Sequence, residues 1–544
     1  MKNSKKALAL LLTLMLAASM VSCGNSSDNS STGSSTGSTA EGESSTAGGE
    51  PASTEITLPL ADGESLSYFI SLDANASIVV DDYNDNEFFQ ALEEKTGVHI
   101  DWMMNSSSDF VTNFNLMIAS NQIPDMVYGV ANYYSDGLDA SIDDGYFMDL
   151  TDKVAEYMPN YQSLRLANPE VEINTKTDSG RLACVYAVYT EEQGPWYGMQ
   201  MRKDWLDELG MEVPTTFDEW EAALTGFKDQ LGAYAPLSLT FNGFDTMNGS
   251  LSAGYGVWAT WQLDETGKVN WGPSMDGWRE YLTKMNDWFE KGLIDPDFMA
   301  QDAFMVDMTS VITGKTGAWT SMYTMPSLYE ASSEDPDMYI VPVTSPVVNE
   351  GDELHLRYRN VSTGITTSVS ANCENWELAL RWLDYLFSED GARLANYGVE
   401  GDTYTMADDG TITFTDKVLA NEEYSFSQAQ ANFLMPPSSI ACYYDWTREL
   451  AAVPEKDIES YDVWSSAGQD WTLPTLSLTQ EESVERAAIM TDIETYAKEN
   501  STQFITGVLD IETGWDEYIS TIQGMNLARA IEITQAAYDR YLER

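Results

Sequence analysis

Residues that often carry catalysis or bind metals are few in this chain, and their spacing matches no common motif. The 544 residues contain only two histidines, His99 and His355, and four cysteines, without a CxxC or HExxH pattern. Zinc fingers, thioredoxin-like redox sites and zinc proteases of the HExxH class are therefore excluded.

Two short patterns imitate catalytic or nucleotide-binding motifs. Residues 33–37 read GxSxG, but they lie in a run of small polar residues with no strand before them, so a nucleophile elbow is excluded there. Residues 314–316 read Gly-Lys-Thr, like the end of a phosphate-binding loop, but Thr309 occupies the place of the first glycine. We expect neither a serine hydrolase nor a nucleotide site.

One set of carboxylates and amides has the spacing of a calcium-binding loop. Asp82, Asn84, Asn86 and Glu93 occupy loop positions one, three, five and twelve. The sixth position, where the sharp turn needs glycine, is Glu87, and the residues after it have a helical pattern. We therefore expect no metal site and no cofactor.

Aromatic side chains stand beside polar ones where predicted strands end or where glycine and proline interrupt the pattern. Such pairs can stack on a flat apolar surface and hydrogen-bond its polar edge, and loops at strand ends often carry ligands. The candidate binding residues are Asp73, Asn75, Asn132, Tyr133, Trp196, Tyr197, Asn242, Phe244, Asp245, Trp319, Tyr323, Tyr443, Asp445 and Trp446.

The elements that would position these residues alternate between strand and helix, which predicts an α/β fold. Strands are predicted at 67–70, 98–102 and 124–129, and helices at 86–96, 110–119, 202–209, 278–291 and 376–387. A further helix begins near Thr216, which has the spacing of a capping box with Glu219.

The charge of the chain restricts its partners. Asp and Glu number 87 against 28 Lys and Arg, for a net charge of −59. Such a chain repels phosphate backbones and anionic lipid head groups, so binding to nucleic acid and electrostatic binding to membranes are not expected.

The N-terminus has the pattern of a lipoprotein export signal. Lysines at 2, 5 and 6 precede a twelve-residue apolar run, 7–18, which is too short to span a bilayer as a mature helix. Small residues then precede Cys23, which predicts removal of residues 1–22 and lipidation of the Cys23 thiol. An ordinary signal peptide that happens to contain cysteine is the alternative.

Two further expectations follow from the segments after the signal. Residues 23–54 form a lipidated tether rich in Gly, Ser and Thr, a composition typical of flexible linkers. The three remaining cysteines, Cys184, Cys373 and Cys442, allow at most one disulfide, and we expect buried free thiols.

From about residue 66 to its end, the chain resembles the extracellular solute-binding proteins of carbohydrate ABC importers, the family of maltose-binding protein (family 1). The lipid-anchored members from Gram-positive bacteria are the most similar type. No single motif decides this, but the order of many does. The matching segments are 93–98, 123–127, 146–150, 202–210, 213–220, 312–317, 397–401, 504–507 and 536–541.

This resemblance implies a two-lobed, type II periplasmic-binding-protein fold with the ligand in the cleft between the lobes. The first lobe would comprise 55–187 and 364–432, and the second 188–363 and 433–544. The chain would cross between them near 181–189, 360–367 and 431–437.

The resemblance also implies a function. The protein would capture an oligosaccharide or related solute at the outer face of the cytoplasmic membrane and deliver it to ABC permease subunits, as a lipid-anchored monomer without enzymatic activity. Two alternatives stay open. A surface-anchored glycosidase also fits an exported, aromatic-rich, lipidated chain, although a carboxylate pair among 87 predicts nothing by itself. An adhesin is disfavoured by the lack of repeats.

Overall fold

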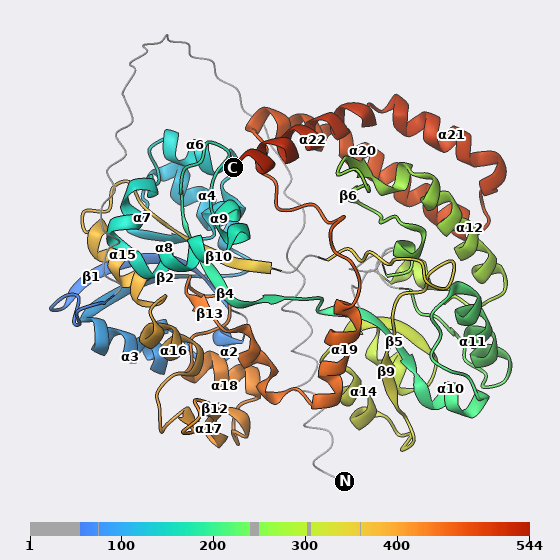
Figure 1. Cartoon of the computed structure of the whole chain (residues 1–544), viewed down its shortest axis with the longest axis horizontal. Coiled ribbons are helices and arrows are strands. Elements are labelled where there is room, and N and C mark those ends of the chain that lie inside the picture. Colours follow the sequence, from blue (N-terminus) through green and yellow to red (C-terminus); the bar gives the residue numbers. More distant parts are fainter. Residues whose placement is uncertain (1–54, 74, 240–249, 302–305, 359–360) are drawn as a thin grey trace.

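The computed structural model describes residues 55–73, 75–239, 250–301, 306–358 and 361–544. It has two lobes side by side, with the earlier part of the chain mainly in one and the C-terminal helices in the other (Figure 1). Each lobe has its own large cluster of buried apolar side chains. The expected two-lobed α/β fold is thus confirmed.

The first lobe is built on a six-stranded sheet. Its strands are β1 (Glu64–Leu72), β2 (Val98–Ser106), β3 (Met126–Tyr128), β4 (Val185–Gln193), β10 (Val361–Val369) and β13 (Tyr443–Tyr444). They lie in the order β13-β4-β10-β3-β1-β2, and β10 is antiparallel to both of its neighbours. The carboxyl ends of β1, β3 and β4 therefore point the same way, toward the second lobe.

Helices and a hairpin surround this sheet. The helices are α2 (Ala76–Val79), α3 (Glu87–Thr96), α4 (Phe110–Ser120), α5 (Val130–Tyr133), α6 (Leu138–Asp143), α7 (Thr151–Tyr157), α8 (Pro159–Ala167), α9 (Pro169–Asn174), α15 (Trp376–Tyr385), α16 (Glu389–Tyr397), α17 (Asp416–Leu419) and α18 (Phe426–Phe433). The hairpin comprises β11 (Tyr404–Met406) and β12 (Ile412–Phe414).

The second lobe has a smaller antiparallel sheet in the order β8-β5-β9 and a larger share of helix. Its strands are β5 (Tyr197–Arg202), β6 (Trp261–Leu263), β7 (Val269–Trp271), β8 (Ala318–Met322) and β9 (Ile340–Pro342). Its helices are α10 (Lys203–Leu209), α11 (Phe217–Asp229), α12 (Asp276–Glu290), α13 (Met308–Ile312), α14 (Pro326–Ser332), α19 (Glu455–Ser465), α20 (Gln480–Ile505), α21 (Ile511–Gly524) and α22 (Leu527–Glu543).

Short-range signals determine several of these elements. The Asn86 side chain accepts a hydrogen bond from the Phe89 N–H and caps α3, and Gly97 ends that helix in the left-handed region at φ 69°. A Cβ at Gly97 would lie 2.1 Å from the carbonyl oxygen of Ala61, so only glycine fits. The predicted capping box of Thr216 and Glu219 is present at the start of α11.

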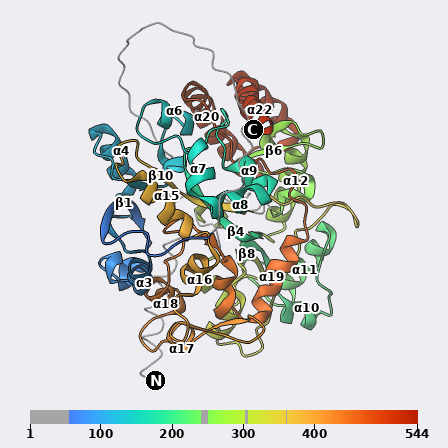
Figure 2. The same ribbon diagram turned by 60° about the vertical axis from the view of Figure 1, so that its left-hand side comes forward.

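The chain passes between the lobes along β4, which begins in the first-lobe sheet and leads through a short turn into β5 of the second (Figures 1 and 2). β10 returns the chain to the first-lobe sheet. Met435, Cys442, Tyr444 and Trp446 still pack in the first-lobe core, so the expected boundary near residue 433 is wrong and lies further along the chain. The strand β13 explains the shift, because it pairs with β4.

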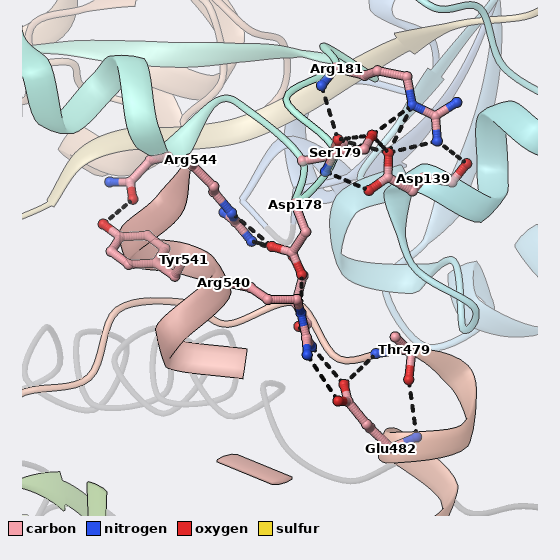
Figure 3. A network of polar contacts seen from close by, with 12 residues as sticks. Asp139, Asp178, Ser179, Arg181, Thr479, Glu482, Arg540, Tyr541 and Arg544 are labelled. Atoms are coloured by element: carbon pink, nitrogen blue, oxygen red, sulfur yellow. Dashed lines mark hydrogen bonds and ion pairs between the residues drawn. The ribbon is translucent and has the colours of Figure 1, made fainter. Parts of the chain in front are cut away.

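A polar contact also joins the lobes, and we call it the Asp178 cluster (Figure 3). Asp178, on the first-lobe loop before β4, accepts hydrogen bonds from Arg540 Nε at 2.9 Å and from Arg544 Nη2 at 2.6 Å, both on or just after α22. Arg540 also pairs with Glu482 of α20, and the Tyr541 hydroxyl donates to Asn174. The last helix of the second lobe is thereby tied to the first lobe.

In the part of the chain that the structure describes, no helix has the length and apolar character needed to cross a membrane. The side chains at the calcium-like spacing serve the local fold instead. Asp82 accepts from the Asn84 N–H, and the buried Asn86 amide donates to the carbonyls of Ala431, Asn432 and Leu434. The residues 1–54, including Cys23, lie outside the described residues.

Candidate functional site

A pocket of about 190 Å³ lies where β4 leaves the first lobe, and we call it the crossover pocket. It is lined by Ala187, Tyr189, Trp196, Ile365, Pro437, Ser438, Ile440, Tyr444 and Glu449. These residues come from β4, from the turn into β5, from β10 and from the segment around β13. The pocket therefore sits at the junction of the lobes, with aromatic walls and one carboxylate.

The carboxylate of Glu449 is held by two donors. The Tyr444 hydroxyl donates to Glu449 Oε1 at 2.6 Å, and Arg448 Nε donates to the same oxygen at 3.0 Å. The Glu449 side chain is 18% exposed. A carboxylate fixed in this way can accept hydrogen bonds from the hydroxyls of a ligand.

Arg448 is the ion-pair partner of Glu449, and its guanidinium is fully buried. It donates to the carbonyls of Ala395 at 2.9 Å and Met435 at 2.7 Å, and it lies over the Tyr444 ring at 5.0 Å. Burial raises the pKa of the Tyr444 hydroxyl well above its usual value, so Tyr444 stays a donor at neutral pH. We call Arg448, Glu449 and Tyr444 the Arg448 cluster.

A chain of aromatic rings connects the pocket with both lobes. Trp196 lies edge-on to Tyr323 of the second lobe at 5.4 Å, Tyr323 lies 6.3 Å from Tyr461 of α19, and Tyr461 lies 5.3 Å from Trp446 of the first-lobe core. The Gly194 N–H donates to the Tyr461 hydroxyl at 2.6 Å, which fixes the turn that carries Trp196. The aromatic wall is thus held in place before any ligand arrives.

The cleft edge of the first lobe presents polar groups next to this wall. Burial raises the pKa of the Tyr128 hydroxyl to about 12, and the nearby Tyr133, Tyr189 and Asp73 make smaller contributions in the same direction. Ser438, which is exposed and lines the pocket, has a φ of 56°, a region that non-glycine residues seldom adopt. Unusual backbone conformations of this kind often occur at binding sites.

The comparisons with known proteins agree with this architecture. Residues 76–393, more than half of the chain, match the family of bacterial extracellular solute-binding proteins. The chain belongs to that family.

Two curated relatives align with most of this solute-binding protein. The fructooligosaccharide ABC transporter substrate-binding protein FusA of Streptococcus pneumoniae is 24% identical over 517 residues, which cover 89% of this chain and 92% of FusA. The lipoprotein LipO of Bacillus subtilis is 24% identical over 502 residues, which cover 88% of this chain and 90% of LipO.

Solved structures support the two-lobed fold of this solute-binding protein. An HMO-binding, ABC-transporter-associated solute-binding protein from Bifidobacterium longum infantis superimposes with a TM-score of 0.71 at 18% identity, over 88% of this chain and 99% of that one. The family and these relatives are binding proteins rather than enzymes.

The structure of the solute-binding protein brings some of the predicted residues together. Trp196 lines the crossover pocket, and the Tyr323 ring packs against the Trp196 ring. Tyr197 is half-buried in β5 opposite Met322, and Tyr443 pairs through its backbone with Val188 of β4. These four lie around the junction of the lobes.

Two tryptophans of the predicted binding set, Trp319 and Trp446, are buried in the cores of the lobes. Trp319 is fully buried within β8 and donates its indole N–H to Gln200 Oε1 at 3.0 Å. One hydrophobic cluster holds Trp319 and another holds its neighbour Ala318, so β8 is covered on both faces. Trp446 is 3% exposed and packs in the first-lobe core.

Other predicted residues have local structural contacts. Asp445 accepts hydrogen bonds from Tyr397 and Thr447 and caps the 3-10 helix 446–452. Asp73 accepts from the Asn75 N–H at 2.8 Å and so shapes the turn into α2.

The remaining candidates are divided between the surface and the interior. Asn132 is exposed on α5, and the Tyr133 ring packs 4.9 Å from Phe110. Asn242, Phe244 and Asp245 lie outside the described residues.

Of the nine residues that line the crossover pocket, only Trp196 is in the predicted set; the others include Tyr189, Tyr444 and Glu449. Tyr189 and Tyr444 lie on adjacent strands, with ring centroids 5.8 Å apart. Only the pairing of β4 with β13 brings them together, and that pairing leaves no local signal. Glu449 follows Trp446 by three positions on a short 3-10 helix, a spacing that would have placed it on the same face.

Proposed function

We propose that this protein is the substrate-binding subunit of an ABC importer and captures an oligosaccharide between its two lobes. The observation that carries the proposal is the crossover pocket, where Tyr189, Trp196 and Tyr444 supply aromatic faces and Glu449 supplies an acceptor. Sugars have apolar C–H faces and hydroxyl edges, which these two kinds of group match. The names of the relatives FusA and the HMO-binding protein favour the same ligand class.

Capture would proceed by closure of the lobes. Because the aromatic wall is shared between them, rotation of one lobe toward the other removes water from the ring faces and the carboxylate together. The closed form would then deliver its ligand to permease subunits in the membrane. The protein would act as a monomer, without catalysis and without a cofactor.

We also propose that the protein is anchored by lipid at Cys23 to the outer face of the cytoplasmic membrane. Residues 1–22 would be the signal peptide and 23–54 the tether. The relative LipO is named a lipoprotein. Cys23→Ala should release the protein from membranes, and equal partition of variant and wild type into membranes would refute the anchor.

Titration calorimetry of the mature chain with neutral oligosaccharides of fructose, glucose and galactose tests the main proposal. Trp196→Ala should weaken binding by about 1–3 kcal/mol, as expected for loss of an aromatic anchor. The control is Tyr234→Ala, which changes an aromatic residue that is 60% exposed elsewhere on the second lobe. Unchanged affinity in Trp196→Ala would refute the site.

Two further measurements separate binding from the alternatives. Small-angle scattering at saturating ligand should show a smaller radius of gyration than without ligand, and an unchanged radius would contradict closure. Chromatography of the sugar after incubation should recover it intact, whereas shortened products would favour a glycosidase.

A further inference from the structure

The first lobe has a second pocket of about 340 Å³, away from the crossover pocket, which we call the tyrosine pocket. Its lining includes Tyr133, Tyr134 and Tyr146 together with Asn115, Asp136 and Asp144. Those residues come from α4, from α5 and from the segments on either side of α6. Nothing in the proposed function uses this pocket.

The walls of the tyrosine pocket are fixed by packing. The Tyr133 ring lies 4.9 Å from Phe110 and 6.1 Å from the buried Phe114. The Tyr134 hydroxyl donates to Asp144 Oδ2 at 2.5 Å, and the Tyr134 ring lies 6.1 Å from Tyr146. Half-buried rings held in this way are surfaces on which a sugar ring can stack without a large loss of side-chain entropy.

The polar groups of this pocket match the hydroxyls of a sugar. Asp136 and Asp144 offer carboxylate acceptors, and Asn115 offers both a donor and an acceptor. Among the described residues, no lysine, arginine or histidine lines either pocket. An anionic sugar in the tyrosine pocket would therefore meet Asp136 and Asp144 without a lining cation. At the crossover pocket the only cation beside Glu449 is the fully buried Arg448, so uronate chains are disfavoured at both places.

Aromatic side chains lie between the two pockets in the first lobe, some of them buried. Phe110 contacts both Tyr133, at 4.9 Å, and Tyr128, at 5.6 Å. Tyr128 pairs with Thr367 of β10, and Tyr189, which lines the crossover pocket, lies over Gly364 of the same strand. Tyr128 of β3 and Tyr189 of β4 are thus separated by one strand, β10, which places the two pockets at neighbouring parts of the same sheet.

We propose that the tyrosine pocket is a second sugar subsite, so that the ligand is a neutral oligosaccharide long enough to reach from the crossover pocket along the first lobe. This inference rests on the proposed function and adds the length and charge of the ligand to it. The crossover pocket holds one part of the chain, and the tyrosine pocket holds a more distant sugar unit.

The test measures affinity against chain length by calorimetry. The mature chain is titrated with fructooligosaccharides and maltooligosaccharides of increasing length, beginning with the disaccharides, and with oligogalacturonates of the same lengths. Wild-type affinity should rise with length within a neutral series. Tyr134→Ala should weaken the longest bound member about tenfold and leave the shortest bound member within about twofold.

Two matched variants complete the design. Tyr134→Phe keeps the ring and removes the hydroxyl that donates to Asp144, so it should retain most of the affinity. Tyr234→Ala, on the other lobe, should change nothing at any length. Melting curves of all variants establish that the fold is intact.

Each possible outcome bears on the inference. Equal weakening of short and long sugars by Tyr134→Ala, or no weakening at all, would overturn the second subsite. Preference for oligogalacturonates would overturn the argument from charge. These results leave the proposed function intact if Trp196→Ala still weakens every bound sugar, whereas a wild type that binds no sugar would refute both.

Discussion

Two clusters of arginine and carboxylate connect parts of this chain that are distant in sequence, and they differ in burial and in what they join. Arg448 has a fully buried guanidinium, and its partners, including Glu449, all belong to the first lobe. Asp178 is 17% exposed, its partners Arg540 and Arg544 are 30% and 4% exposed, and their contact crosses from one lobe to the other. The same chemical groups thus stabilise one lobe in the first case and join the two lobes in the second.

This difference shows what burial does to an ion pair. A fully buried guanidinium cannot recover its hydrogen bonds from water, so loss of either partner is costly. A partly exposed pair can exchange its partners for water at small cost. The Arg448 cluster is therefore suited to a fixed support for the crossover pocket, and the pair of Asp178 with the partly exposed Arg540 can be broken at smaller cost.

The largest expected effect is on Arg448. Arg448→Met removes one of the two donors to Glu449 and the donor to the carbonyls of Ala395 and Met435, and should lower the free energy of unfolding by about 3–5 kcal/mol. Urea titration followed by tryptophan fluorescence measures it. Arg393→Met is the control, because its partner Glu389 is 92% exposed, and it should change stability by no more than about 1 kcal/mol. Equal losses in both variants would contradict the role of burial.

The next effect concerns the contact between the lobes. Asp178→Asn removes the carboxylate shared by Arg540 and Arg544. The present arrangement of the two lobes should therefore lose about 1–3 kcal/mol of stability relative to other arrangements. Spin labels on the two lobes should report a broader distribution of distances by electron resonance.

Asp139→Asn is the matched control for that variant. Asp139 binds Arg181 and Ser179 within the first lobe, beside the Asp178 cluster (Figure 3). The Asp139→Asn substitution should leave the distribution of distances between the lobes unchanged. The same broadening in both variants would mean that the first lobe itself had loosened.

Acid should destabilise the second lobe through Glu482, which pairs with Arg540 next to the Asp178 contact. Burial raises the pKa of Glu482, but hydrogen bonds from Arg540 and Thr479 outweigh it and hold the pKa below the usual 4.5. Glu482 therefore contributes stability that is fully present above about pH 4.5 and is lost as the pH falls through the lowered pKa. Unfolding measured from pH 6 to pH 3 should show a shallower acid slope in Glu482→Gln, and an identical slope would disprove the linkage.

The smallest expected effect is on thiol reactivity. Burial raises the pKa of the Cys442 thiol to about 12, and the described cysteines Cys184, Cys373 and Cys442 are free and buried, as expected. Native protein should react very slowly with a thiol reagent at pH 8. Arg448→Met should speed the reaction by loosening the first-lobe core, whereas Asp178→Asn should not. Equal acceleration in both variants would contradict the conclusion that only the Arg448 cluster supports the first-lobe core.

Local signals in the sequence predicted the elements well. The strands at 67–70 and 98–102 and the helix ended by Gly97 depend on neighbouring residues, and all are present. The positions of the aromatic side chains were harder to predict. Trp196 and Trp319 both follow glycine-containing turns, yet Trp196 lines a pocket and Trp319 is fully buried. Trp319 is buried by residues 306–340, which include the flanking helices α13 and α14, whereas the other face of β8, at Ala318, packs in the large second-lobe cluster.

The order of strands in the first lobe has a consequence for how the chain folds. β10 lies between β3 and β4, and β13 pairs with the other side of β4, so this sheet cannot be complete before residue 444 has been made. The second-lobe core likewise needs Ile493, Phe504 and Leu527 near the end of the chain. Pairings this distant in sequence form slowly. A nascent chain that stops before residue 361 leaves the edges of β3 and β4 unpaired, so both lobes must mature together after nearly the whole polypeptide has been released.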